Sequence, residues 1–111
     1  MPKDDAIYVG HMLDTARQAM DLLRGLSREE YDRNDSVRIA LAHLVQVIGE
    51  AASRVSEPTR LAHPEVPWIQ IIGMRHKIVH DYMNVDYDIV WEVVRFDLPA
   101  LVETLRKATA E

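Results

Sequence analysis

The sequence predicts an all-α protein, an antiparallel bundle of about four main helices. Apolar residues recur at helical spacing along most of the 111 residues, and strand-like alternation is absent. Short runs with glycine, proline or capping residues separate the helical segments, so neighbouring helices should be antiparallel with short connections. The length is that of one domain, and we expect a single helical domain over residues 1–111.

The first helix is predicted from an apolar stripe near the N-terminus. Asp4 or Asp5 is a suitable cap at its start, and Gly25 lies near its end. After it, Ser27 and Glu30 have the spacing of a capping box, which predicts a short helical turn. The stripe consists of Val9, Met12, Leu13, Ala16, Ala19, Met20 and Leu23.

A second long helix should begin near Asp35 or Ser36 and end at or before Pro58. Three of the five prolines fall within residues 58–67, which predicts a loop, and Pro67 suits the first position of the next helix. The stripe of this second helix consists of Val37, Ala40, Leu41, Leu44, Val45, Ile48, Ala51, Ala52 and Val55.

Two further helices are predicted in the C-terminal half. Residues 68–82 are expected to be helical, and residues 84–86 should form a break with Asp86 as the cap of the last helix. Pro99 falls inside the pattern of that last helix and should kink or interrupt it. Its stripe consists of Tyr87, Val90, Trp91, Val94, Leu98, Leu101, Val102 and Leu105.

The composition narrows the class of function. The net charge of −5 argues against a protein that coats nucleic acid, because phosphate contacts require a basic excess. Any chemistry on a nucleic acid would therefore need a local basic pocket. Between Arg60 and His80 the fixed charges are Arg60, Arg75 and Lys77 against Glu65 alone, so this is the most basic region of the chain.

The sequence also bears on location and cofactors. With no cysteine there is no disulfide framework and no thiolate metal site, which favours a reducing, cytoplasmic setting. No apolar run approaches the roughly 18 residues of a membrane span, and the start has no signal pattern. We therefore expect a cytoplasmic protein with no membrane partner and no cofactor.

The segment RHKIVHDY, Arg75 to Tyr82, concentrates the side chains that could carry chemistry. On a helix His76 and His80 are direct neighbours, whereas Arg75 and His80 are about 140° apart. Arg75 reaches His80 only if the helix loosens before His80, if its long side chain narrows the gap, or if a second subunit contributes.

Three interpretations of this segment compete. In the first, Arg75 pairs with a carboxylate such as Glu50, and the histidines cap the helix or bind carbonyl groups. In the second, His76 and His80 hold zinc with a third ligand such as Asp81. In the third, the segment cleaves RNA without a metal, because histidine can serve as base or acid near neutral pH and arginine binds phosphate oxygens.

The spacing Arg75-x4-His80-x-Tyr82 resembles the Arg-x4-His-x-Tyr motif of HepT-like toxins of the HEPN superfamily. The polar His76 after the arginine also fits that pattern. The resemblance extends over nearly the whole chain, through IGEAA (residues 48–52), PWIQIIGMRHKIVHDYMNVDYDIVW (residues 67–91) and LPAL (residues 98–101).

The resemblance implies a homodimeric four- to five-helix bundle that acts as a metal-independent endoribonuclease toxin. Arg75 would stabilise the phosphate, His80 would be the acid or base, and His76 would assist or orient. The partners would be an RNA substrate and a cognate MntA-like nucleotidyltransferase antitoxin. That antitoxin would silence the toxin by attaching AMP to Tyr82, which would add bulk and negative charge beside Arg75.

An alternative from a different class is a non-catalytic helical module that holds a nucleotide or substrate for a nucleotidyltransferase partner. Such a protein would bind its partner and nucleotides but would cut no RNA. Metal in stoichiometric amount in the purified protein would instead support a zinc-containing bundle.

Overall fold

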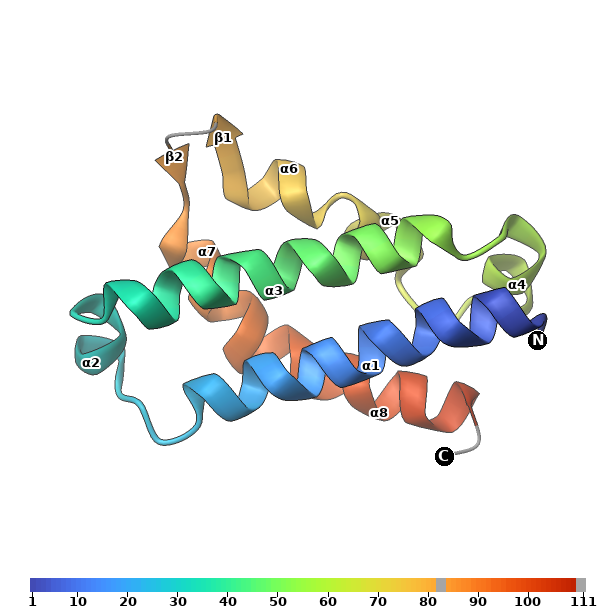
Figure 1. The fold of residues 1–111 in the computed structure, drawn as a ribbon, viewed down its shortest axis with the longest axis horizontal. Helices are drawn as coiled ribbons and strands as arrows, with labels where there is room; N and C mark the ends of the chain where they lie inside the picture. Colours follow the sequence, from blue (N-terminus) through green and yellow to red (C-terminus); the bar gives the residue numbers. More distant parts are fainter. Residues whose placement is uncertain (82–83, 110–111) are drawn as a thin grey trace.

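The computed structural model describes residues 1–81 and 84–109 of the chain and confirms the all-α prediction (Figure 1). The long helices α1 and α3 lie antiparallel, and α8 lies beside α1. The elements are α1 (Lys3–Leu23), α2 (Arg28–Asp32), α3 (Asp35–Arg54), α4 (Glu57–Ala62), α5 (Trp68–Ile72), α6 (Met74–Ile78), β1 (Val79–Asp81), β2 (Asn84–Val85), α7 (Tyr87–Glu92), the π-helical turn η1 (Val93–Asp97) and α8 (Leu98–Ala108).

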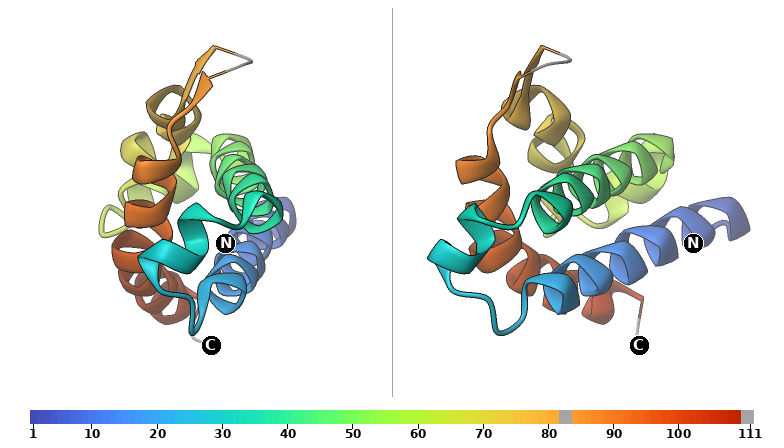
Figure 2. Two further views of the ribbon diagram at one scale, coloured as in Figure 1. Left: turned by 90° about the vertical axis from the view of Figure 1, so that its left-hand side faces the viewer. Right: turned by 60° about the vertical axis from the view of Figure 1, so that its left-hand side comes forward.

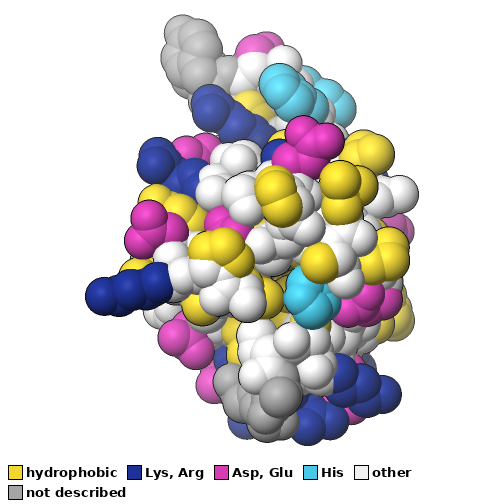
Figure 3. Space-filling view, turned by 90° about the vertical axis from the view of Figure 1, so that its right-hand side faces the viewer, with side chains coloured by type: hydrophobic (Ala, Val, Ile, Leu, Met, Phe, Trp, Pro, Cys, Tyr) yellow, Lys and Arg dark blue, Asp and Glu magenta, His cyan; other side chains and the backbone are white. Residues whose placement is uncertain are grey.

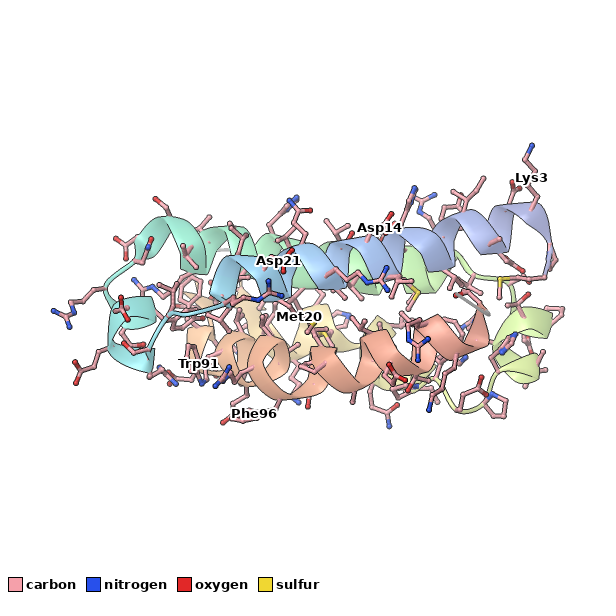
Figure 4. All side chains as sticks on the ribbon, turned by 90° about the horizontal axis from the view of Figure 1, so that it is seen from below. Lys3, Asp14, Met20, Asp21, Trp91 and Phe96 are labelled. Atoms are coloured by element: carbon pink, nitrogen blue, oxygen red, sulfur yellow. The ribbon has the colours of Figure 1, made fainter. Side chains whose placement is uncertain are left out.

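The core lies where the apolar stripes of α1, α3 and the C-terminal helices meet. Figure 4 shows Met20 in the space between α1 and the C-terminal helices, and Phe96 on the side facing away from α1. Burial of these stripes is the main favourable contribution to folding. The buried members include Met12, Ala16, Leu41, Val45, Ile48, Ala52, Val90, Leu98 and Leu105.

Three helices begin where predicted, and each start has a side-chain cap. The Ser27 hydroxyl accepts from the Glu30 amide, and the Glu30 carboxylate accepts from the Ser27 amide, both at 3.1 Å. The Asn34 side chain caps α3 at the predicted place, and Asp86 caps α7. In these cases a side chain satisfies amides that have no partner within their helix.

The prediction for the N-terminal aspartates was wrong. Helix α1 begins at Lys3 without a side-chain cap, and Asp5 is buried inside it. The Asp5 carboxylate accepts hydrogen bonds from the Ser56 amide at 2.9 Å, the Ser56 hydroxyl at 2.6 Å and the Thr59 hydroxyl at 2.5 Å. These bonds, the one from the Ser56 hydroxyl foremost, lower the pKa of Asp5 below its ordinary value of 3.8.

The predicted loop over residues 58–67 is also partly wrong, because its first part is the helix α4. Pro58 lies at the start of this helix, where a missing amide hydrogen costs nothing. The bonds from Ser56 and Thr59 to Asp5 tie α4 to α1. The polar atoms that stabilise α4 therefore come from a distant part of the chain.

Helix α2 is held against α7 by aromatic and charged side chains. Tyr31 is fully buried, its hydroxyl donates to the Tyr87 carbonyl at 2.7 Å, and its ring lies 5.1 Å from that of Trp91. Arg28 forms ion pairs with Asp32 and Asp88. Burial raises the pKa of Tyr31 to about 12. This cluster fixes the start of α7.

The predicted helix over residues 68–82 departs most from the structure. It breaks at Gly73 into α5 and α6, and it ends at Ile78. The chain then forms an antiparallel hairpin in which Val79 pairs with Val85, with an irregular register. Figure 2 shows this hairpin projecting from the helical body.

A hydrogen bond across the hairpin accompanies the early end of the helix. The Asp86 amide donates to the Ile78 carbonyl at 2.7 Å, so that carbonyl is satisfied from across the hairpin. Both strands are very short, which is why no alternation is visible in the sequence.

Pro99 interrupts the last helix as predicted. It lies in the first turn of α8, directly after the π-helical turn η1. Proline has no amide hydrogen to donate to the carbonyl of Arg95, and its ring crowds that carbonyl, so the helix widens there. Among the helices of the described residues, none is long and apolar enough to cross a membrane.

Candidate active site

Four side chains of the predicted motif region form a solvent-facing group that we call the basic edge. It consists of Arg75, His76, Lys77 and His80. Helix α6 buries Met74 and Ile78, which turns the three residues after Met74 outward. Figure 3 shows Lys, Arg and His side chains gathered at the end of the molecule that carries the hairpin, with acidic side chains beside them.

Arg75 does not form the ion pair expected of a helix edge. Glu50, the expected partner, lies 3.1 Å from the Arg54 guanidinium. Within residues 1–81 and 84–109, Arg75 has no hydrogen bond, ion pair or aromatic contact. The interpretation of Arg75 as half of a surface ion pair with Glu50 is therefore wrong, and its guanidinium is open to a ligand.

His80 lies on β1 rather than on the helix that carries Arg75 and His76. The angle of about 140° between Arg75 and His80 on an ideal helix therefore does not apply. The His80 ring is 61% exposed, and its Nε2 atom lies 3.8 Å from Oδ2 of Asp86. The structure thus brings His80 together with Asp86, a residue that sequence reasoning identified only as a helix cap.

The remaining motif residue, Tyr82, lies outside the residues that the structure describes. The described residues do bear on the zinc interpretation. Across the described ranges no group of three His, Asp or Glu side chains is placed to hold a metal ion. His76, His80 and Asp81 are accordingly not assembled as a ligand set, although Asp81 does accept a hydrogen bond from Asn84 at 2.8 Å.

Two hollows lie near the basic edge. A depression of about 480 Å³ between the hairpin and α7 is lined by His80, Asn84, Asp86 and Asp88, among others. A larger groove of about 690 Å³ runs between α5–α6 and η1–α8, with Lys77 and the exposed Phe96 on its wall. The basic edge therefore lies between a polar hollow and a more apolar one.

The chemistry available at the basic edge follows from these positions. Arg75 offers a planar fork of donors that suits phosphate oxygens. His76 and His80 offer groups that can take or give a proton near neutral pH. Both side chains are exposed, so a substrate could reach them without opening the core. This combination of an arginine and two histidines suits phosphoryl transfer at a phosphodiester bond rather than binding of an apolar molecule.

The fold and this edge together define an α-helical protein with an exposed arginine–histidine site. The model of the family "Ribonuclease HepT-like" matches residues 12–108. The chain therefore belongs to the HepT-like ribonuclease family, as the motif predicted.

Several curated proteins are similar to the chain. "Putative RNase TTE0752" of Caldanaerobacter subterraneus subsp. tengcongensis is 30% identical over 100 residues, which is 90% of this chain and 89% of the relative. "Probable ribonuclease HepT" of Thermococcus cleftensis is 30% identical over 102 residues, or 86% of this chain and 93% of the relative. "Putative RNase MJ1216" of Methanocaldococcus jannaschii is 29% identical over 96% of this chain and 89% of the relative. No solved structure gives a significant match.

Proposed function

We propose that this protein is a metal-independent endoribonuclease and the toxin of a toxin–antitoxin pair. The observation that carries the proposal is the state of the basic edge. Arg75 has no partner among the described residues, and His80 is largely exposed. Both side chains can therefore reach a phosphate group without first breaking a strong contact within the protein. The RNase names of the relatives support RNA as that ligand.

In the proposed reaction, the 2′-hydroxyl of RNA loses its proton and its oxygen forms a bond to phosphorus. The bond from phosphorus to the 5′-oxygen breaks, and that oxygen receives a proton. The products carry a 2′,3′-cyclic phosphate and a 5′-hydroxyl. His80 takes or gives one of these protons, His76 assists, and Arg75 stabilises the charge on the phosphate oxygens.

We propose that the active form is a homodimer in which two basic edges share one cleft. Pairing the edges doubles the local positive charge, which favours RNA binding to a chain of net charge −5. It also allows Arg75 of one copy to act with His80 of the other. Mixing inactive Arg75→Ala protein with inactive His80→Ala protein would then restore cleavage, whereas sites built within single copies would stay inactive.

The proposed regulator is an MntA-like nucleotidyltransferase that transfers AMP from ATP to the hydroxyl of Tyr82, two residues after His80, and releases pyrophosphate. The added phosphate would repel RNA and could occupy Arg75. The test is the intact mass of the protein after co-expression with a nucleotidyltransferase encoded beside it. The proposal expects added mass in AMP units that maps to Tyr82 and is absent from Tyr82→Phe protein.

The activity itself is tested with purified protein and RNA in EDTA. We expect cleavage that leaves 2′,3′-cyclic phosphate ends and that is lost in Arg75→Ala and in His80→Ala. Cleavage that persists in both variants would overturn the site. A protein that binds nucleotides and its partner but cuts no RNA at any concentration would instead be the non-catalytic module.

A further inference from the structure

We propose that Asp86 is a positioning residue that holds the His80 imidazole for proton transfer, in addition to capping α7. This inference rests on the proposed ribonuclease function of His80. It starts from the 3.8 Å approach of Asp86 Oδ2 to His80 Nε2. In a protein without substrate, contacts of this kind are often long and shorten when the substrate binds.

The two oxygens of Asp86 have separate roles. Oδ1 accepts hydrogen bonds from the amides of Asp88 and Ile89, both at 3.1 Å, which is the capping interaction. Oδ2 is the atom that faces His80. Because the cap fixes the carboxylate through Oδ1, Oδ2 is held toward the ring rather than free to rotate away.

In the antiparallel hairpin the two residues lie diagonally, with His80 towards the turn and Asp86 away from it. Val79, which precedes His80, pairs with Val85, which precedes Asp86. The Asp86 amide also donates to the Ile78 carbonyl at 2.7 Å. These contacts place the histidine and the carboxylate on adjoining segments whose relative position does not depend on side-chain flexibility.

The start of α7 is itself anchored to the helical body. The Tyr31 hydroxyl binds the Tyr87 carbonyl, and Arg28 pairs with Asp88. The Arg38 guanidinium lies 5.1 Å from the centre of the Tyr87 ring. The residue that follows Asp86 is therefore held from two sides, and this rigidity is what a positioning group requires.

The chemical consequence concerns the ring nitrogens. A carboxylate at Nε2 favours a proton on that atom, which leaves Nδ1 to face the substrate. The carboxylate also stabilises the charged imidazolium, whether His80 begins charged as an acid or becomes charged as a base. Among the described residues, the other charged or titratable groups on the elements around His80 are Asp81 on β1, Tyr87 and Asp88 on α7, and Arg75, His76 and Lys77 on α6.

Asp86→Asn separates the two roles of the residue. Asparagine is as good a cap as aspartate, so α7 should keep its start, but the negative charge is lost. We expect kcat/KM for RNA cleavage to fall about 2- to 5-fold, as suits a partly exposed pair. We also expect the limb of the pH–rate profile that reports His80 to move to lower pH, because the variant lacks the negative charge that favours the imidazolium. If the acidic limb moves, His80 is the base; if the alkaline limb moves, it is the acid.

Two further variants act as controls. Asp86→Ser also keeps a capping oxygen without the charge, so it should reproduce the effect if the asparagine variant is poorly folded. Asp88→Asn removes the same charge from the same hollow, but its partner is Arg28. Asp88→Asn should move that limb of the pH–rate profile by less than half as far as Asp86→Asn does. A purely structural Asp86 would instead lower activity only in proportion to the melting temperature, with no movement of either limb.

The same contact can be measured without activity, by following the His80 ring proton in an NMR titration. A midpoint at lower pH in Asp86→Asn than in the natural protein supports the contact. If that shift is seen but the natural protein cuts no RNA, the proposed function fails and the contact stands. If the natural protein cuts RNA and Asp86→Asn changes neither the pH profile nor the midpoint, the positioning role is overturned and the function stands.

Discussion

Two groups of polar side chains in this molecule differ in how they are bonded. Near the start of α1, the buried Asp5 carboxylate accepts three hydrogen bonds from Ser56 and Thr59. At the basic edge, Arg75 has no partner among the described residues and His80 has one loose contact. Figure 1 places the start of α1 beside α4, away from the hairpin that carries His80.

This difference separates the polar residues that stabilise the fold from those that a ligand can bind. A buried carboxylate without its hydrogen bonds would destabilise the protein, so the bonds to Asp5 are required by its position. Exposed groups at the basic edge carry no such requirement. Removing the first group should therefore change stability, and removing the second should change activity alone.

The largest expected effect lies at the basic edge. His80→Ala and Arg75→Ala should each lower RNA cleavage at least about 100-fold, because proton transfer and charge stabilisation each contribute on that order. The melting temperature should change by less than about 2 °C, as for exposed residues elsewhere. Cleavage rates and thermal unfolding of the same preparations measure both quantities.

Matched controls sharpen this result. His11 is an exposed histidine on α1, and Arg24 is an exposed arginine paired with Asp21. His11→Ala and Arg24→Ala remove the same chemical groups elsewhere and should leave cleavage unchanged. A large loss of stability in the basic-edge variants would contradict the distinction between the two groups.

The second-largest expected effect concerns the contact between α3 and α5, the helix that precedes α6 and the basic edge. A Cβ atom at Gly49 would lie 2.9 Å from the Ile71 carbonyl oxygen, a backbone atom that cannot move aside. Gly49→Ala should therefore destabilise the protein by about 1–3 kcal/mol. Gly10 on α1 has open space, so Gly10→Ala should stabilise it by about 0.5–1 kcal/mol. Unfolding by urea measures both, and equal effects would argue against close contact of α3 with α5.

The sequence predicted the parts of the fold that local signals control. The stripes of α1 and α3, the capping box at Ser27 and the cap at Asp86 each act within one or two helical turns. The motif also predicted Arg75 and His80 as candidate site residues, and the structure shows both side chains exposed.

Other features depend on partners far along the chain. Asp5 resembles a helix cap in sequence, but its bonds go to residues more than 50 positions away. The end of α6 at Ile78 depends on the amide of Asp86 across the hairpin. The approach of Asp86 to His80 follows from that hairpin, so a search of one helix could not find it. Tyr31 stands among charged residues in the sequence, yet α7 and Trp91 bury it.

A smaller effect tests the anchor between α2 and α7. Tyr31→Phe removes the hydroxyl that donates to the Tyr87 carbonyl and leaves the ring in place. We expect a loss of about 1 kcal/mol in the free energy of unfolding. Because this anchor supports Asp86, kcat for RNA cleavage should fall by less than in Asp86→Asn. A variant as stable as the natural protein would show that this hydrogen bond has no net effect.

The last prediction is the pH dependence of the Asp5 group. The pKa of Asp5 is lowered in the folded state, so its contribution is fully present above its unfolded value of 3.8. It is lost as the pH falls below that value, through the folded pKa. Asp5→Asn should therefore have a melting temperature several degrees lower at pH 7, and this difference should shrink as the pH falls below 3.8.

Asp4→Asn provides the control for this measurement, because Asp4 is the exposed neighbour on the same first turn. It removes the same charge from the same helix end but none of the bonds to Ser56 and Thr59. If both variants had the same melting temperature at every pH, the stabilisation would come from charge at the start of α1 and not from the buried bonds. A difference for Asp5 alone that disappears in acid would assign it to the carboxylate–hydroxyl contacts that join α1 to α4.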